Sequence, residues 1–465
     1  MPAGLTGDTK VVKSNGHTII PFCAGAGEQR SFTLHNCASC IYILVSILQA
    51  SIRMSIHSIS REIVDSILEG LDSNTDRDSI RALSRVSRSF RSHCLRILFS
   101  VLSFHPPSSP HVPTTCRSFY NLVQSIPHIP SLVRTLNIRE GTQDHLWIPT
   151  EPTFPDVMRA LVNVTAISMV FVKISSLPEA SRSAITNQRL TRIHLDSVHF
   201  RSDDEFRALL RYSSDSLEIL DLGNITFDSG TRSSDGSMRI QPAECRLTML
   251  MLDVQSEGDA EVLNILFGLH PPIRMDMVEK LWLTEVCISS DAVVEGLDKL
   301  WNCLVVSGGG MLASISVGDC HGLEEALRPV TLNGISEISF LTTTSGSVGF
   351  SPSLQWWSNN FSRAAVATEG WEPDEITIIL QLETGSSAPL VSLFDDESID
   401  AWTRMDTSLC GVGVIGTPAV EVRIILDANH DSTSDFLFMQ SWVRRQLPML
   451  HEGRFLQVRQ AMGDL

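Results

Sequence analysis

Short runs in which apolar and polar residues alternate recur along the chain from about residue 117. The clearest is residues 217–222, with the sequence LEILDL. A repeat of two residues is typical of a β-strand that buries one of its two sides. We expect strands at residues 132–138, 164–170, 190–195, 217–222, 247–252, 278–283, 312–317, 335–340, 376–380 and 422–426.

Between several of these runs, apolar residues recur three and four positions apart, which indicates amphipathic helices. Their apolar positions are Phe206, Leu209 and Leu210, then Val262, Leu263, Leu266 and Leu269, then Val293, Val294, Leu297 and Leu300. The early strands begin 32, 26, 27, 30 and 31 residues apart. A strand and a helix repeated at about this interval are typical of a leucine-rich-repeat solenoid, whose units bury their apolar sides against their neighbours. We therefore predict an α/β fold with an irregular leucine-rich-repeat-like solenoid at residues 117–340, and diverged repeats or a C-terminal cap at residues 341–465.

The segment before the solenoid has a different pattern. Residues 55–105 predict a small helical domain, and residues 106–116 form a proline-rich linker. The first helix has Ile59, Ile63, Ile67 and Leu71 every four positions, and the second has Ile80, Leu83, Val86 and Phe90 on one face. We expect residues 1–54, which are rich in Gly, Ser and Thr, to be a disordered extension. One hypothesis is that Met54 is a natural start, which the intact mass of the native protein would decide.

The helical segment carries a recognisable motif at its end. Residues 86–91 read Val-Ser-Arg-Ser-Phe-Arg, and Glu62 follows the first apolar position of the preceding helix. On these residues, the stretch 56–102 resembles the F-box of fungal F-box proteins, and residues 119–138 look like the start of the repeats in such proteins. The resemblance implies that the unit packs on a Skp-type adaptor of a cullin ligase. The residues that we expect at the adaptor are Ile59, Ile63, Leu68, Val86 and Phe90; the alternative is that these five form the internal core of a small helical bundle.

The resemblance implies a non-catalytic role. An F-box protein is a substrate receptor that links a target protein to an SCF-type cullin–RING ubiquitin ligase, and the repeats would bind that unknown target. Two residues depart from the family pattern, because Ser60 stands where proline is usual and Phe90 where tryptophan is usual. The alternative function is therefore a repeat-based interaction scaffold with no role in ubiquitination.

Composition narrows these possibilities. The chain has 465 residues, of which 43% are hydrophobic, so it can bury a large core. Its net charge of −17 argues against binding to nucleic acid. The apolar run 37–50 is shorter than the ~20 residues that span a bilayer, so we expect no membrane partner. The ten cysteines are scattered, which favours a reducing compartment, cytoplasmic or nuclear.

Two segments resemble cofactor motifs without the context that those motifs require. Cys37 and Cys40 form a single Cys-x-x-Cys, whereas a structural zinc site needs four ligands. Residues 411–416 fit the spacing Gly-x-Gly-x-x-Gly, but a strand-like run follows them where a dinucleotide site has a helix. We therefore expect no metal, no cofactor and no enzymatic activity. An enzyme that uses this glycine segment is the third and weakest hypothesis.

Overall fold

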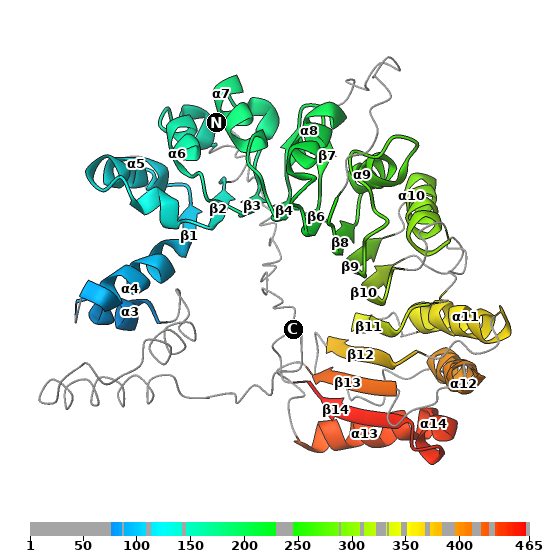
Figure 1. The fold of residues 1–465 in the computed structure, drawn as a ribbon. Coiled ribbons are helices and arrows are strands. Elements are labelled where there is room, and N and C mark those ends of the chain that lie inside the picture. Colours follow the sequence, from blue (N-terminus) through cyan, green and yellow to red (C-terminus); the bar gives the residue numbers. More distant parts are fainter. Residues whose placement is uncertain are drawn as a thin grey trace, which may run out of the picture.

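The computed structural model of the chain describes residues 76–85, 88–107, 113–141, 146–228, 245–287, 290–306, 311–321, 332, 334–345, 351–367, 373–383, 396–411, 420–426 and 433–461. Within these residues, twelve strands form one sheet in which every neighbouring pair is parallel and the spatial order follows the chain order (Figure 1). The strands are β1 (Val101–Phe104), β2 (Thr135–Arg139), β3 (Ala166–Val170), β4 (Arg192–Asp196), β6 (Ile219–Gly223), β8 (Met249–Val254), β9 (Lys280–Cys287), β10 (Ser314–His321), β11 (Glu337–Ser345), β12 (Glu375–Glu383), β13 (Val420–Leu426) and β14 (Leu456–Gln460).

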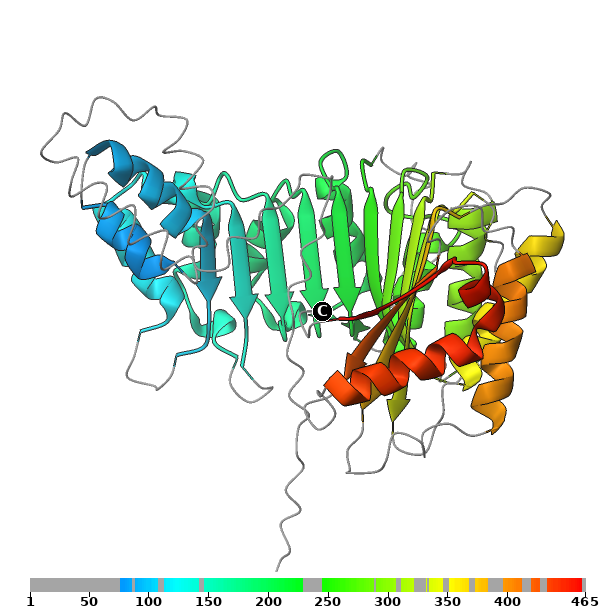
Figure 2. The same ribbon diagram turned by 90° about the horizontal axis from the view of Figure 1, so that it is seen from below.

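The helices lie on the outer side of this curved sheet (Figure 1), whose strands run side by side in the view from below (Figure 2). They are α3 (Arg77–Leu83), α4 (Arg88–Ser100), α5 (Thr115–Ser125), α6 (Phe154–Ala160), α7 (Glu179–Thr186), α8 (Asp203–Ser213), α9 (Glu257–Phe267), α10 (Asp291–Trp301), α11 (Ser351–Ala367), α12 (Asp396–Gly411), α13 (Thr433–Gln446) and α14 (Pro448–Glu452). Short helical turns add η2 (Ile129–Leu132), η3 (Ile148–Thr150), η4 (Ile174–Ser176) and η5 (Asn302–Val306). The predicted mixed α/β fold is confirmed in this form, as a large parallel sheet with helices.

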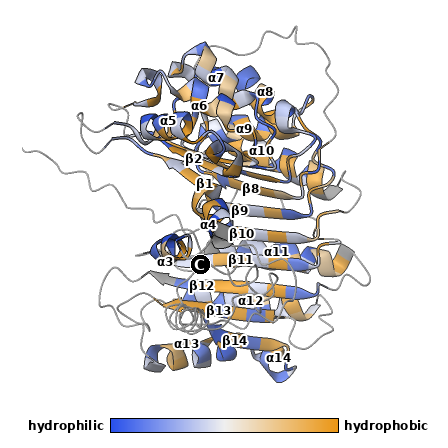
Figure 3. Cartoon of the chain, turned by 60° about the vertical axis from the view of Figure 1, so that its left-hand side comes forward, coloured by the Kyte–Doolittle hydropathy of each residue, from blue (hydrophilic) through white to orange (hydrophobic). Residues whose placement is uncertain are grey.

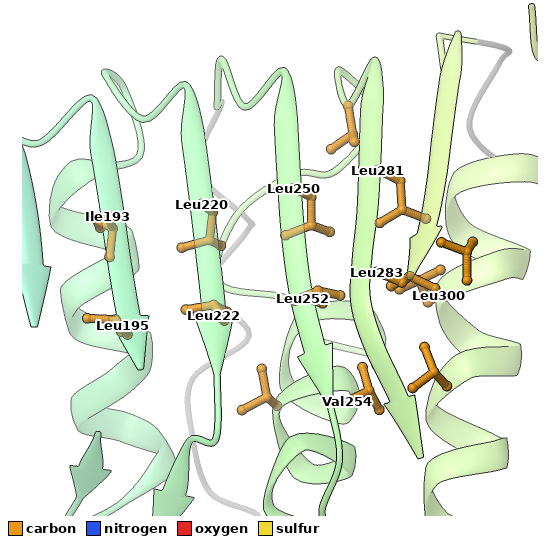
Figure 4. Close-up of a cluster of buried hydrophobic side chains, with 14 of the residues drawn as sticks. Ile193, Leu195, Leu220, Leu222, Leu250, Leu252, Val254, Leu281, Leu283 and Leu300 are labelled. Carbon is orange, nitrogen blue, oxygen red and sulfur yellow. The ribbon is translucent and has the colours of Figure 1, made fainter. Parts of the chain in front are cut away.

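Each predicted alternating run is a strand because its apolar residues fill the space between the sheet and the helices. Leu220 and Leu222 of β6 are buried, and so are their registered neighbours Leu250 and Leu252 of β8 (Figure 4). The residues between them point to the opposite side of the sheet and stay partly exposed. Figure 3 shows this mixture of hydrophobic and hydrophilic positions along the strands. One side of the sheet is thus buried and the other is polar.

A tight turn recurs after three successive strands. Phe171, Ser197 and Asn224 each follow the last residue of β3, β4 and β6, and each has a positive φ of 53 to 59°. The spacing of these residues is 26 and then 27 positions. The Phe171 amide donates to the Asp196 carbonyl and the Ser197 amide to the Gly223 carbonyl, at 3.0 and 2.9 Å. Each turn therefore bonds to the next unit along the chain, and beyond it β5 (His199–Phe200) pairs with β7 (Thr226–Phe227).

The N-terminal helices differ in their bounds from the sequence prediction. The second predicted helix, over residues 80–90, is divided, because α3 ends at Leu83 and α4 begins at Arg88. The apolar stretch 95–102, which we expected to be a third element of the helical domain, is the end of α4 and the start of β1. Strand β1 pairs with β2 and Phe104 is fully buried, so residues 101–104 belong to the sheet.

The sheet continues without interruption through residues 341–461, where β11 to β14 remain parallel and in register. The tryptophan pair Trp356 and Trp357 packs in the core, as expected, and Phe340 stacks on Trp357 with ring centroids 4.8 Å apart. The glycine segment begins at the last residue of α12, Gly411, and residues 412–419 lie outside the described part of the chain. Among the helices of the described residues, none combines the length and the apolar character needed to cross a bilayer.

Candidate interaction surface

The polar side of the sheet is the largest candidate surface. Across it, the registered strands place one row of side chains that alternates with the buried leucines. This row is Ser168, His194, Asp221, Met251, Trp282, Ser316, Ser339 and Thr377, of which all but Thr377 are partly exposed. Helices of the described residues lie on the other side (Figure 1). We call this polar, helix-free side the open face.

Acidic residues gather where neighbouring strands of the open face end. Asp196 ends β4, Asp253 lies near the end of β8, and Glu285 is its registered neighbour in β9. Gly223 of β6 lies between Asp196 and Asp253, and a Cβ atom at this glycine would lie 3.2 Å from Asp253 Cβ and 3.8 Å from Asp196 Oδ1. Two carboxylate side chains therefore flank a position that has no side chain of its own. We call Asp196, Asp221, Asp253 and Glu285 the acidic cluster.

The acidic cluster holds negative charge that its surroundings do not neutralise. Burial raises the pKa of Asp253 to about 7; the Gln255 hydrogen bond opposes this, and the charges of Glu285 and Asp196 add to it. The Gln255 amide donates to Asp253 Oδ2 at 2.9 Å and to Glu285 Oε2 at 2.7 Å, so one neutral group bridges both acids. Asp253 Oδ1 is buried without a hydrogen-bond partner. In the described part of the chain, no basic side chain forms an ion pair with Asp253, Glu285 or Asp196.

His194 supplies one cationic group beside the cluster. Its Nδ1 lies 2.6 Å from Asp221 Oδ2 on the neighbouring strand. Burial disfavours the imidazolium, but the hydrogen bond and charge of Asp221, helped by Asp196, outweigh burial and raise the pKa of His194. The pair keeps one charge of the cluster compensated when the imidazole is protonated.

An aromatic residue borders the same end of the open face. Phe171 follows β3, and its ring is 46% exposed. The guanidinium of Arg139 lies 5.6 Å from the ring centroid, within the range of a cation–π contact. A bulky residue at positive φ is strained, and the inter-strand hydrogen bond of its amide fixes that conformation. Phe171 adds apolar surface next to Asp196.

The C-terminal end of the open face has its charges paired. Arg423 lies 2.9 Å from Glu421 and 3.7 Å from Glu375, and Arg459 lies 3.3 Å from Glu421. These pairs connect β12, β13 and β14. The two ends of the face thus differ, because carboxylates meet arginines at one end and meet other carboxylates at the other.

The structure describes little of the adaptor-binding residues that the sequence predicts. Ile59, Ile63, Leu68 and Val86 lie outside the described residues, and Phe90 is described only by its backbone in the first turn of α4. Their role stays a prediction. Cys37 and Cys40 also lie outside, and within the described residues no three His, Cys, Asp or Glu side chains form a group that could hold a metal ion.

Sequence reasoning missed the acidic cluster. It considered His194 and His199 as surface residues of the repeats, and His199 does pair across the turn ladder, with Nε2 2.7 Å from Asp228 Oδ1. The available signal was the acidic residue directly after the last leucine of a run, as in Leu195-Asp196 and Leu252-Asp253. A single run cannot show it, because the register between strands decides which residues meet.

The chain matches no protein-family model, and no curated protein matches it significantly. Its function is therefore inferred from its own residues.

Proposed function

We propose that the chain is a non-catalytic substrate receptor, in which the segment 55–105 binds a Skp-type adaptor of a cullin–RING ubiquitin ligase and the open face binds the target protein. The sheet and its helices would form a leucine-rich-repeat-like solenoid. The observation that carries this proposal is a parallel sheet in chain order with helices on one side only.

Physical reasoning connects this arrangement to binding. Parallel sheets in ordinary α/β domains are covered on both faces and read as continuous apolar runs. Here each strand alternates buried and polar positions, so the polar side is built for contact with water or with a partner. Stacked strand–helix units produce an extended concave surface of this kind, which repeat proteins use for recognition.

The N-terminal helices support the adaptor part of the proposal. Helices α3 and α4 lie where the resemblance expects the last helices of an F-box, and α4 passes directly into β1. A connection without a loop would hold a bound adaptor at a fixed angle to the open face. A receptor needs this rigidity because it acts by holding its target near the ligase.

The test is a pull-down of the full chain with the Skp-type adaptor of its host. The disruptive variant is Ile63→Asp with Val86→Asp, and the matched control is Thr403→Asp with Leu437→Asp, at exposed positions of α12 and α13. The proposal expects the wild type and the control variant to bind, and the disruptive variant to lose binding. Hydrogen exchange over residues 55–100 shows whether that helical unit is still folded.

A second pair of substitutions tests the same contact by gain of binding. Ser60→Pro with Phe90→Trp restores the residues that the family usually has, so adaptor affinity should increase. If a folded wild type fails to bind and these substitutions restore nothing, the chain is a repeat-based scaffold without a role in ubiquitination.

A further inference from the structure

We propose that the acidic end of the open face binds a basic segment of a partner protein, with an arginine or lysine side chain seated over Gly223 between Asp196 and Asp253. This inference names the chemical class of the target and rests on the proposed function for the role of that target in ubiquitination. The docking itself needs only the open face.

The geometry around Gly223 supplies the seat. Both carboxylate side chains lie within 3.8 Å of the point that a Cβ atom of this glycine would occupy. They approach it from β4 on one side and β8 on the other, with β6 between. A guanidinium has five donors in a planar fork, so one arginine can bond to acceptors on both sides of it.

The charges of the face commit the site to a cation. The acidic cluster brings four carboxylates onto three neighbouring strands and the one between them, and one neutral amide bridges two of these carboxylates. Independently of that charge, Asp253 Oδ1 is buried and has no hydrogen-bond partner. A partner that donates hydrogen bonds and carries positive charge would relieve both conditions.

The shape of the surface favours a polypeptide over a small cation. Neighbouring strands lie about 4.8 Å apart, so Asp196 and Glu285, three strands from one another, span roughly 14 Å. An extended segment of about four residues covers that distance. Exposed Phe171 lies next to Asp196 and offers apolar contact to the aliphatic part of a long basic side chain.

The experiment measures binding of a labelled peptide by fluorescence anisotropy with the full chain at low salt. The probe is a peptide of several Gly-Arg-Ser repeats, and the matched control peptide has citrulline in place of each arginine, which keeps the shape and removes the charge. We expect the arginine peptide to bind and the citrulline peptide to bind at least about tenfold more weakly, because two or more charge pairs are lost.

Three variants separate a seated cation from general attraction to an acidic chain. Asp196→Asn with Asp253→Asn should weaken binding about fivefold or more. Asp204→Asn with Glu257→Gln removes the same charge from exposed positions in the first turns of α8 and α9, so it should leave affinity nearly unchanged. Gly223→Ala fills the seat without any change of charge and should weaken binding severalfold, with the melting temperature recorded for each variant.

The outcomes are distinct. Equal binding of both peptides, no binding by the wild type, or equal losses in the open-face and helix variants would each overturn the proposal. Adaptor capture of the Asp196→Asn, Asp253→Asn variant distinguishes the two proposals. If that variant still binds the adaptor but not the peptide, the docking site stands; if the wild type binds the peptide but not the adaptor, the ligase role fails alone.

Discussion

Substitution of Asp253 by asparagine should stabilise the chain at pH 8 and give no gain at pH 4. The pKa of this carboxyl is raised to about 7 in the folded chain, because burial and the acidic neighbours Glu285 and Asp196 disfavour its charge. In the unfolded chain the same group titrates near its usual value of about 3.9. Between these values the folded state binds the proton more tightly, so stability from this group is present at low pH and is lost as the pH rises from about 4 to about 7.

The size of the effect follows from the shift. The pKa rises from 3.8 to about 7, and about three pKa units at 1.36 kcal/mol each set an upper limit of about 4 kcal/mol. Asp253 is partly exposed, so solvent screens its interactions and reduces the expected gain to about 1–2 kcal/mol. The asparagine keeps an acceptor for the Gln255 amide, so this hydrogen bond should survive the substitution.

The assay is urea unfolding of the wild type and of Asp253→Asn at pH 4, 6 and 8, followed by tryptophan fluorescence. The control is Asp204→Asn, which removes an exposed charge from the first turn of α8. The difference between Asp253→Asn and the wild type should grow with pH, whereas the control should show no such trend. A variant no more stable than the wild type at pH 8 would refute the interpretation of the acidic cluster as uncompensated charge.

Three further substitutions test the packing. Leu250→Ala removes a fully buried side chain between β8 and the helices and should cost about 2–5 kcal/mol in urea unfolding; a loss below about 1 kcal/mol would contradict the one-sided core. Gly258→Ala should lower the melting temperature although alanine favours helices by about 1 kcal/mol, because its Cβ would lie 2.4 Å from the Ile225 carbonyl oxygen; a higher melting temperature would show that α9 can move away. Glu140→Gln should cost about 2 kcal/mol, because this buried carboxylate accepts two backbone amides and the glutamine can accept only one of them with its single oxygen; calorimetry would detect the loss, and an unchanged melting temperature would contradict it.

The sequence predicts the strands of the sheet well because their physics is local. In residues 217–222 the period of two marks the buried side before any partner strand is known, and the structure has β6 there. Strand β14 was missed because Val458 is its one buried residue, so its sequence carries hardly any alternation. Strand β1 was missed because the apolar residues before it continue from α4, and helix and strand cannot be separated in such a run.

The candidate site could be predicted far less well. Asp196 and Asp253 are 57 positions apart in the chain, and their approach depends on the register of β4, β6 and β8. The empty position between them depends on one glycine, Gly223, whose meaning appears only when its neighbours are in place. Alternation identifies the polar side of a strand but does not show which polar residues meet across the sheet.

The most direct test of the central claim asks whether one chain binds the adaptor and the basic peptide at the same time. Immobilised Skp-type adaptor is incubated with the full chain and then with the labelled arginine peptide. The account predicts that the beads retain the peptide only when the chain is present, and that retention is lost with Ile63→Asp, Val86→Asp and, separately, with Asp196→Asn, Asp253→Asn. Beads that fail to retain the wild-type chain, or that retain the chain but not the peptide, would contradict a receptor that joins a basic target to the ligase.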